Sequence, residues 1–215
     1  MMVPPTNRVQ LQHVFRELDN VQRKSCPTLV RDTEKGIWGP SSIDIVCKLF
    51  EKINLEKYRK FLDIGSGDGR VVLVASLCTN ATGIECDKEL IDKGIDISKK
   101  FKLNAHFIRG DFYDHDFSQY DIIFTNPDTG FYNGMEDKLL NELNGLLIVY
   151  NNVFLPRFLR RGKTHWIGGI PITEYKNLKP QTFHWCSHQW NSGVLNNKHD
   201  VVTSCLLLTK SNPKK

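Results

Sequence analysis

The stretch FLDIGSGDGR, residues 61–70, decides the fold of this 215-residue chain. Three glycines, at positions 65, 67 and 69, follow one apolar run and precede another. Glycine reaches backbone conformations that other residues avoid, and its missing side chain lets a ligand lie against the main chain. In an open parallel sheet, ligands bind beyond the carboxyl ends of the strands. The glycine loop is therefore the first candidate for a ligand site.

Short apolar runs alternate with helical patterns on both sides of this loop. Such alternation predicts an α/β fold, a parallel sheet with helices on both faces. Two later runs are expected to add an antiparallel hairpin at one edge of the sheet. We expect strands at 60–65, 81–87, 105–111, 120–127 and 145–152, helices at 70–78, 88–101 and 135–144, and the hairpin at 181–190 and 200–210.

The chain before the glycine loop is expected to form a helical extension. Residues 8–24 carry an apolar stripe of helical period, and residues 25–40 have the composition of a loop. A further helix is expected to begin near Ser41 or Ser42, either of which can cap it. We therefore divide the chain into an N-terminal helix with a lid-like loop, residues 1–40, and a ligand-binding domain, residues 41–215.

The charge of the chain is unevenly distributed. Residues 1–150 hold 19 Lys/Arg and 22 Asp/Glu, whereas residues 151–215 hold 10 Lys/Arg and only two acids. This basic region is either a solvated surface or a contact for an acidic partner. No apolar run approaches the roughly 20 residues of a membrane span, and no signal peptide is evident. We expect a cytoplasmic protein that does not contact a membrane, with its six cysteines reduced.

The spacing of the glycine loop argues against a dinucleotide. The fingerprint G-x-G-x-x-G requires glycine at position 70, which is arginine. Glu85 ends the next predicted strand, 22 residues beyond Asp63, where a carboxylate can accept hydrogen bonds from both hydroxyls of a ribose. Asp111 ends the third strand and is followed by Phe112, a pair suited to the amino group and ring of an adenine. Either acid alone is typical of a surface; together they favour a nucleoside.

From about residue 40 onward the chain resembles the class I S-adenosylmethionine-dependent methyltransferases, through DIGSGDG, GIECD and RGDFYD. The resemblance implies a Rossmann-like, seven-stranded sheet whose last strand is antiparallel. It implies that Asp63, Gly65 and Gly67 lie along the methionine part of S-adenosylmethionine, with Glu85 at the ribose and Asp111 near the adenine. The full set of expected cofactor residues is Asp63, Gly65, Ser66, Gly67, Gly69, Glu85, Cys86, Asp111, Phe112 and Asn126.

The end of the fourth strand is the candidate catalytic segment. Asn126-Pro127 resembles the start of the [DNS]-P-P-[YFW] motif of methyltransferases that act on planar amino nitrogens. There the Asn side-chain oxygen and the Pro carbonyl accept hydrogen bonds from the attacking amine. Asp128 and Thr129 depart from the motif, and Phe131 and Tyr132 follow at the wrong offset for stacking. A plain turn is the alternative interpretation of this segment.

A second resemblance points to a different acceptor. DIGSGDGRVV and the upstream GPSS resemble small protein lysine methyltransferases of archaea and mitochondria. We expect a methyltransferase that acts on an amino nitrogen of a macromolecule, an RNA or DNA base or a protein side chain. Two alternatives stay open, a protein lysine methyltransferase and an inactive, cofactor-binding partner subunit. A nucleotide-dependent reductase is disfavoured by Arg70.

The remaining candidates concern the acceptor. Trp38 either closes over the substrate or anchors its loop in the core. Arg157, Arg160 and Arg161, in an expected loop after the fifth strand, are positioned to meet a nucleic acid or an acidic protein face. His184, Cys186 and His188 share one face of a predicted strand, but a fourth zinc ligand is not evident, so no metal is expected. The sequence does not indicate the oligomeric state.

Overall fold

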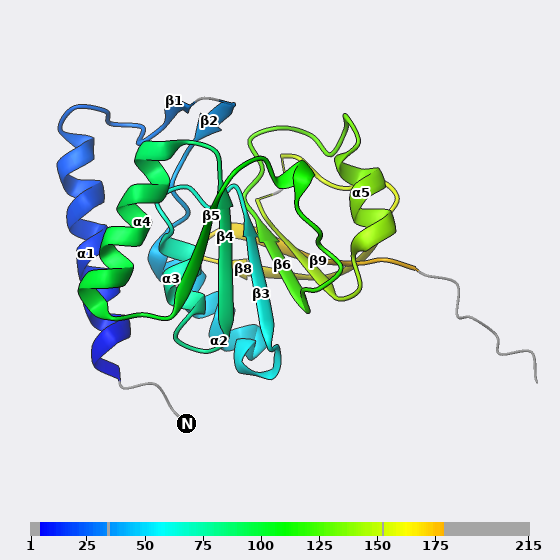
Figure 1. Cartoon of the computed structure of the whole chain (residues 1–215), viewed down its shortest axis with the longest axis horizontal. Helices are drawn as coiled ribbons and strands as arrows, with labels where there is room; N and C mark the ends of the chain where they lie inside the picture. The colour runs from blue at the N-terminus through cyan, green and yellow to red at the C-terminus, as the bar shows by residue number, and fades with distance from the viewer. Residues whose placement is uncertain (1–4, 34, 152, 179–215) are drawn as a thin grey trace, which may run out of the picture. The chain divides into compact units, whose positions relative to one another are not determined.

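Seven strands form one mostly parallel sheet in the computed structural model, which describes residues 5–33, 35–151 and 153–178. They are β3 (Lys60–Ile64), β4 (Asn80–Glu85), β5 (Ala105–Arg109), β6 (Ile122–Thr125), β7 (Leu146–Tyr150), β8 (Arg160–Ile167) and β9 (Ile170–Lys176). Their order is β5-β4-β3-β6-β7-β9-β8 (Figure 1). The first five are parallel, and β9 and β8 are antiparallel to their neighbours. The predicted Rossmann-like sheet is confirmed.

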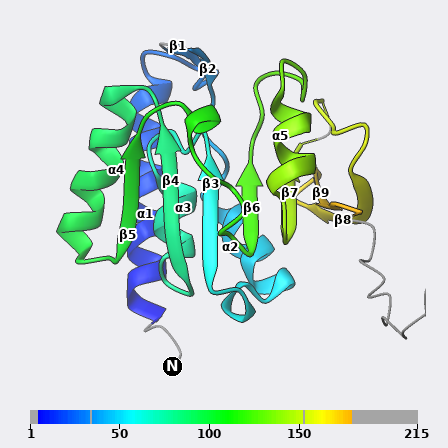
Figure 2. The ribbon, with the colours of Figure 1, turned by 45° about the vertical axis from the view of Figure 1, so that its right-hand side comes forward.

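Helices cover both faces of the sheet. They are α1 (Pro5–Arg23), α2 (Ile43–Ile53), α3 (Arg70–Ala75), α4 (Lys88–Phe101) and α5 (Met135–Glu142), with short 3-10 turns η1 (Leu55–Lys57) and η2 (Phe112–Asp114). α1, α2 and α3 pack against one another, and α5 lies against the opposite face (Figure 2). None of the helices in the described ranges is long and apolar enough to cross a membrane.

The alternation of apolar residues along the strands builds two cores. On β6, Ile122 and Phe124 face the core under α1, α2 and α3, whereas Ile123 faces the core under α5. Successive side chains of a strand point to opposite faces, so a strand buried on both faces is a continuous apolar run. The continuous apolar runs of β3, β6 and β7 are typical of strands in the middle of a sheet. The carboxyl ends of the parallel strands all lie at one edge of the domain.

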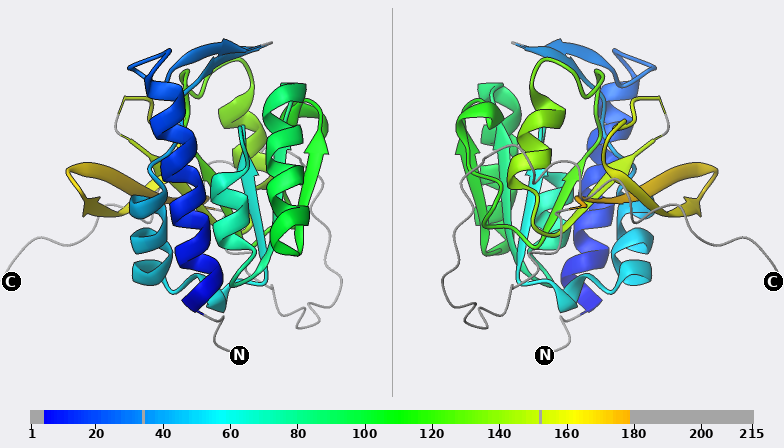
Figure 3. Two further views of the ribbon diagram at one scale, coloured as in Figure 1. Left: turned by 90° about the vertical axis from the view of Figure 1, so that its left-hand side faces the viewer. Right: turned by 90° about the vertical axis from the view of Figure 1, so that its right-hand side faces the viewer.

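The predicted loop at residues 25–40 contains a small hairpin, β1 (Arg31–Thr33) and β2 (Gly36–Trp38). Three-residue strands are too short to give an alternating pattern, which explains why the sequence did not indicate them. The hairpin lies across the end of the sheet toward which the parallel strands point (Figure 3). α2 begins directly after it, with Ser42 at the N-cap but without a side-chain capping bond.

The antiparallel hairpin of the sheet is β8–β9, within residues 160–176, where a basic loop was expected. Gly168 and Gly169 make its turn with φ of +59° and +80°. Positive φ at both central residues matches the twist of paired strands, so two glycines between apolar runs were an available hairpin signal. The strands predicted at 181–190 and 200–210 lie outside the described residues.

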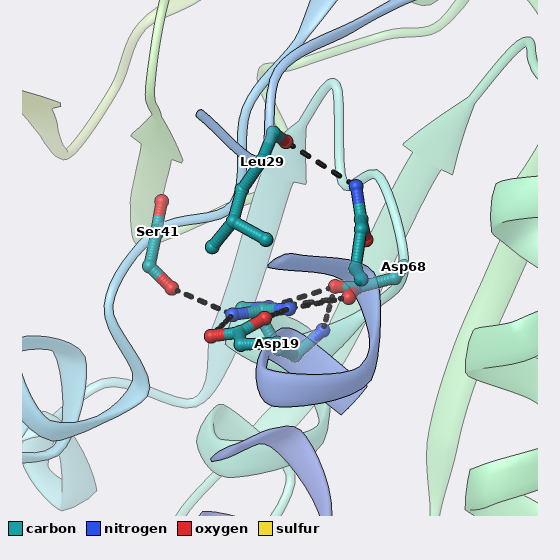
Figure 4. Close-up of polar contacts among 6 residues, drawn as sticks. Asp19, Leu29, Ser41 and Asp68 are labelled. Carbon is teal, nitrogen blue, oxygen red and sulfur yellow. Dashed lines mark hydrogen bonds and ion pairs between the residues drawn. The ribbon is translucent and has the colours of Figure 1, made fainter. Parts of the chain in front are cut away.

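Arg70, which stands where a third glycine would complete the dinucleotide fingerprint, is 2% exposed and joins three segments. Its guanidinium donates to Asp68 at 2.7 Å, to Asp19 of α1 at 2.8 Å and to the Ser41 carbonyl at 3.3 Å. Figure 4 shows Asp19, Ser41 and Asp68 converging on this position. The Phe15 ring lies 4.9 Å from the guanidinium carbon. Burial alone would lower the pKa of Arg70, but the carboxylates of Asp68 and Asp19 outweigh this effect and raise it above its ordinary value.

Replacement of Arg70 by methionine is expected to lower the free energy of unfolding by about 3–5 kcal/mol, because Asp68 is left buried without a counter-charge. Urea unfolding measures the change. The matched control is Arg16→Met, which breaks an exposed α1–α2 ion pair with Asp44 and should change stability little. Equal effects of the two substitutions would contradict a central role for Arg70.

Candidate functional site

A cavity lies beyond the carboxyl ends of the parallel strands, where the strand order reverses between β3 and β6. The loops after β3, β4, β5 and β6 form its floor and walls, and the β1–β2 hairpin forms its roof. Of the predicted site residues, the cavity is lined by Trp38, Asp63, Gly65, Ser66, Glu85, Cys86, Asp111, Phe112, Asn126 and Pro127. The topology therefore brings segments up to about 90 residues apart to one place, as expected for this class of sheet.

The four loop residues that were expected to bind the cofactor, Gly65, Ser66, Gly67 and Gly69, do not share one role. Gly65 has φ of +69° with open space where a Cβ would be, and Ser66 has a buried hydroxyl without a partner among the described residues. Gly67 and Gly69 do not line the cavity. A Cβ at Gly67 would overlap the Trp38 indole, and one at Gly69 would meet Phe107. Gly65 and Ser66 thus face a ligand, whereas the other two glycines permit close packing.

Glu85 is held in place by the backbone around it. Its Oε2 accepts from the Gly67 N–H at 2.8 Å, and its Oε1 accepts from the Asp87 N–H at 2.9 Å. The side chain is buried, and Oε1 also accepts from the Cys86 thiol at 3.5 Å, whereas Oε2 has a second lone pair. An acceptor position on Oε2 therefore remains for a ribose hydroxyl.

Asp111 follows β5, next to the Glu85 end of β4, and its side chain is bound to the roof. Its carboxylate accepts from the Tyr113 N–H at 3.0 Å and forms an ion pair with Lys35 at 2.5 Å. The Lys35 hydrogen bond is the main reason that the pKa of Asp111 is lowered. Beside it, Gly110 faces open space and the Phe112 ring packs on Tyr113 at 4.7 Å. A flat ring has room at this wall, next to an aromatic side chain.

Asp63 is the most deeply buried acid of the cavity. It is the last residue but one of β3 and is 2% exposed, and the pKa of its carboxyl is raised well above the ordinary value, first by burial and then by Glu85 and Asp68. Neighbouring carboxylates in a poorly solvated site disfavour a further negative charge. A cationic ligand group would relieve this repulsion, so the electrostatics of the cavity favour a positively charged ligand.

The segment after β6 closes the acceptor side. The Asn126 amide lies between Ser41 and Asn151, donating to the Ser41 hydroxyl at 3.3 Å and accepting from Asn151 at 2.9 Å. Asp128 accepts from the Ile37 N–H at 2.8 Å, so the residue that breaks the Asn-Pro-Pro motif holds the hairpin over the cavity. A side chain at Gly36 would overlap the Asp128 carboxylate.

The three arginines expected beside the acceptor lie elsewhere. Arg160 and Arg161 belong to β8, the edge strand of the sheet, and not to a loop. None of them lines the cavity, and Arg157 borders a separate groove with Phe158. The expected loop is wrong for Arg160 and Arg161, because both residues pair with β9, whereas Arg157 lies in the segment between β7 and β8 as expected.

The sequence analysis did not identify the roles of three residues. Lys35 pairs with Asp111, Asp128 holds the hairpin, and Asn151 donates to Asn126. Lys35 and Asp128 act through contacts across 76 and 91 residues, which no local pattern reveals. Ser41 was named only as a helix cap. The described residues contain no group of three or more side chains suited to a metal, and His184, Cys186 and His188 lie outside them.

The sequence pattern of one protein family, described as histone methylation protein DOT1, matches residues 31–148. This range is more than half of the chain and contains the hairpin, the glycine loop, Glu85, Asp111 and Asn126. The chain belongs to the DOT1 family. Membership confirms the predicted enzyme class, an S-adenosylmethionine-dependent methyltransferase, and its cofactor. No curated protein sequence matches the chain significantly.

Several solved structures that are similar to this DOT1-family chain are described as methyltransferases. An RNA methyltransferase from Salinibacter ruber, in complex with S-adenosyl-L-homocysteine, has a TM-score of 0.55 at 20% identity, covering 65% of this chain and 95% of that one. The putative methyltransferase yhhF from Escherichia coli has a TM-score of 0.53 at 19% identity, covering 65% and 88%. A Pyrococcus abyssi tRNA (uracil-54, C5)-methyltransferase has a TM-score of 0.54 at 13% identity, and the match covers 68% of this chain and 43% of that one. At these identities the likeness shows the fold alone.

The cavity fits the cofactor of the DOT1 family. Ser66 offers a buried hydroxyl without a partner, and Gly65 and Gly110 leave space that any Cβ would fill. The acids Asp63, Glu85 and Asp111 stand around this space and suit a ligand that carries positive charge. The residues present therefore match a cationic nucleoside better than a pyrophosphate.

Replacement of Asp63 by asparagine is expected to stabilise the cofactor-free protein at pH 7. The folded pKa of Asp63 lies above the unfolded value of about 3.9, so its contribution to stability is full below that value and is lost as the pH rises toward the folded pKa. The advantage of the variant should therefore disappear near pH 4. Thermal unfolding at both pH values, without and with S-adenosylmethionine, measures it.

Asp116→Asn is the control of opposite sign. The pKa of this exposed carboxyl is lowered by the Ser118 N–H, so its loss should destabilise at pH 7. If Asp63→Asn instead melts lower than wild type at pH 7 without cofactor, the charge repulsion inferred for the cavity is contradicted.

Proposed function

We propose that the chain transfers a methyl group from S-adenosylmethionine to the side-chain amine of a lysine in a protein. The family description names histone methylation, and the matched range includes every wall of the cavity. The observation that carries the choice of acceptor is the clamp between Asp128 and the Ile37 N–H. It commits the loop after β6 to holding the roof rather than to a slot for a flat base.

The aromatic side chains near this loop are also committed. Thr129, at the motif's aromatic position, bonds the Tyr132 hydroxyl at 2.7 Å. The Tyr132 ring packs across Gly130, and Phe131 belongs to the buried core under α5. Stacking on an aromatic ring is how proteins commonly hold an extruded base. The arrangement therefore supports an acceptor that enters as a thin, flexible chain.

S-adenosylmethionine would supply a methyl group on its cationic sulfonium. An amine nitrogen would form a bond to the methyl carbon as the bond from that carbon to sulfur breaks and S-adenosyl-L-homocysteine leaves. Glu85 would hold the ribose hydroxyls, Asp111 and Phe112 the adenine, and Asp63, Gly65 and Ser66 the methionine part. Asn126 and Pro127 would accept hydrogen bonds from the acceptor nitrogen and direct its lone pair, and such placement accounts for much of the catalysis. The basic edge strand β8 lies apart from this chemistry.

The acceptor amine must lose a proton before it can attack. A lysine ammonium in water has a pKa of about 10.4, and an apolar surrounding lowers that value by desolvation. Ile37, Trp38, Phe131 and Met135 line the cavity and would supply such an apolar surrounding for the acceptor. We propose that residues 1–40 act as an N-terminal helix and a lid over the domain formed by residues 41–215, so that closure of the hairpin completes this desolvation.

The acceptor class is tested with tritium-labelled S-adenosylmethionine and a fractionated cell extract. The label is expected in protein, released by protease but not by nuclease, and recovered as methyl-lysine after acid hydrolysis. Label in RNA or DNA would overturn the lysine assignment and favour the planar-amine reading of Asn126-Pro127. Absence of label in every fraction, with the cofactor bound, would indicate an inactive partner subunit.

Replacement of Glu85 by alanine is expected to weaken S-adenosylmethionine binding by about 1.5–3 kcal/mol, the usual value of hydrogen bonds to a charged group. Calorimetry measures the change. Asp92→Ala, which removes an exposed carboxylate of α4, is the control and should leave the affinity unchanged. An unchanged affinity in the Glu85 variant would remove that residue from the site.

A further inference from the structure

We propose that Asn151 is a positioning residue for methyl transfer, acting through the side-chain amide of Asn126. The proposal rests on the proposed role of Asn126 toward the acceptor nitrogen, and it holds for an amine of protein or nucleic acid alike. Asn151 follows β7 and does not line the cavity, whereas Asn126 and Ser41 do. Its influence on the reaction must therefore pass through another side chain.

A backbone N–H sets the orientation of the whole chain of amides. The Val153 N–H can only donate, and it donates to Asn151 Oδ1 at 2.8 Å. The nitrogen of Asn151 must then face the other way, where it donates to Asn126 Oδ1 at 2.9 Å. Asn126 in turn presents its own nitrogen to the Ser41 hydroxyl at 3.3 Å. Each amide is oriented by the one before it.

This orientation presents an oxygen to the acceptor. A carbonyl oxygen has two lone pairs, and Asn151 occupies one of those on Asn126. The second can accept an N–H of the acceptor amine, which directs the nitrogen lone pair toward the methyl group. Without Asn151 the Asn126 amide can rotate and offer a donor instead, which would repel the N–H groups of the amine.

The backbone conformation at position 151 suits glycine better than asparagine, which indicates that the asparagine side chain has a role there. Its φ is +93°, a conformation that is strained for a non-glycine residue and that glycine would adopt freely. The position is held by the Asn151 N–H, which donates to the Pro171 carbonyl at 3.0 Å. Asparagine keeps this strained backbone and also supplies the oriented amide that glycine lacks.

The test separates the amide from the backbone. Asn151→Gly keeps the positive φ and removes the amide, while Asn151→Asp keeps the shape but presents only acceptors to Asn126. Both should lower kcat roughly ten- to a hundredfold, the scale of a lost positioning contact, and leave the cofactor Kd within twofold. The double variant Asn126→Ala/Asn151→Gly should be no slower than Asn126→Ala, because the two act as one unit.

Asn54→Gly is the matched control, since it replaces another asparagine of positive φ, at the end of α2 and outside the cavity, and should not change kcat. A wild-type kcat in Asn151→Gly, or a loss that adds to that of Asn126→Ala, would overturn the proposal. The labelled acceptor, of whatever class, serves for these rates, so a nucleic-acid acceptor overturns only the proposed function.

A second readout does not depend on turnover. The side-chain amide resonances of Asn126, assigned by their loss in Asn126→Ala, should shift in Asn151→Gly and remain in place in Asn54→Gly. Unshifted resonances would show that Asn151 does not hold the Asn126 amide, and would overturn the proposal even for an inactive chain.

Discussion

The buried guanidinium of Arg70 is the constraint on which the site depends. A charge that is 2% exposed must be paired, and the pairing recruits Asp68 of the glycine loop, Asp19 of α1 and the Ser41 carbonyl. These three groups come from parts of the chain that share no local pattern. Because they converge on one side chain, the floor of the cavity, the N-terminal helix and the first acceptor-side residue are held in one arrangement.

The roof is attached by the same kind of contact on three sides. Lys35 pairs with Asp111, Arg31 with Glu89 of α4, and the Ile37 N–H with Asp128. Each ion pair is partly exposed to solvent and of modest strength. The hairpin is joined to the cavity wall at Asp111 and to the loop after β6, and a ligand at Asp111 would compete with the Lys35 contact.

The acids of the cavity suit a cationic nucleoside better than a pyrophosphate. Asp63, Glu85 and Asp111 surround the space that Gly65 and Gly110 leave open, and burial beside Glu85 and Asp68 disfavours the charged form of Asp63. A pyrophosphate would add to that repulsion, whereas a positive ligand group would relieve it.

Local pattern was enough to identify the sheet, the glycine loop and three acids at one edge of the sheet, because these depend on the period of apolar residues and on the order of strands. Asp63 and Glu85 lie in the last two residues of β3 and β4, and Asp111 follows β5, so their meeting at one edge follows from topology alone. Local pattern did not predict the hairpin β1–β2, the position of Arg160 on an edge strand, or the hydrogen bonds that link Ser41, Asn126 and Asn151. They depend on hydrogen bonds and ion pairs between side chains far apart in the chain, and only the packed structure decides which of these partners meet.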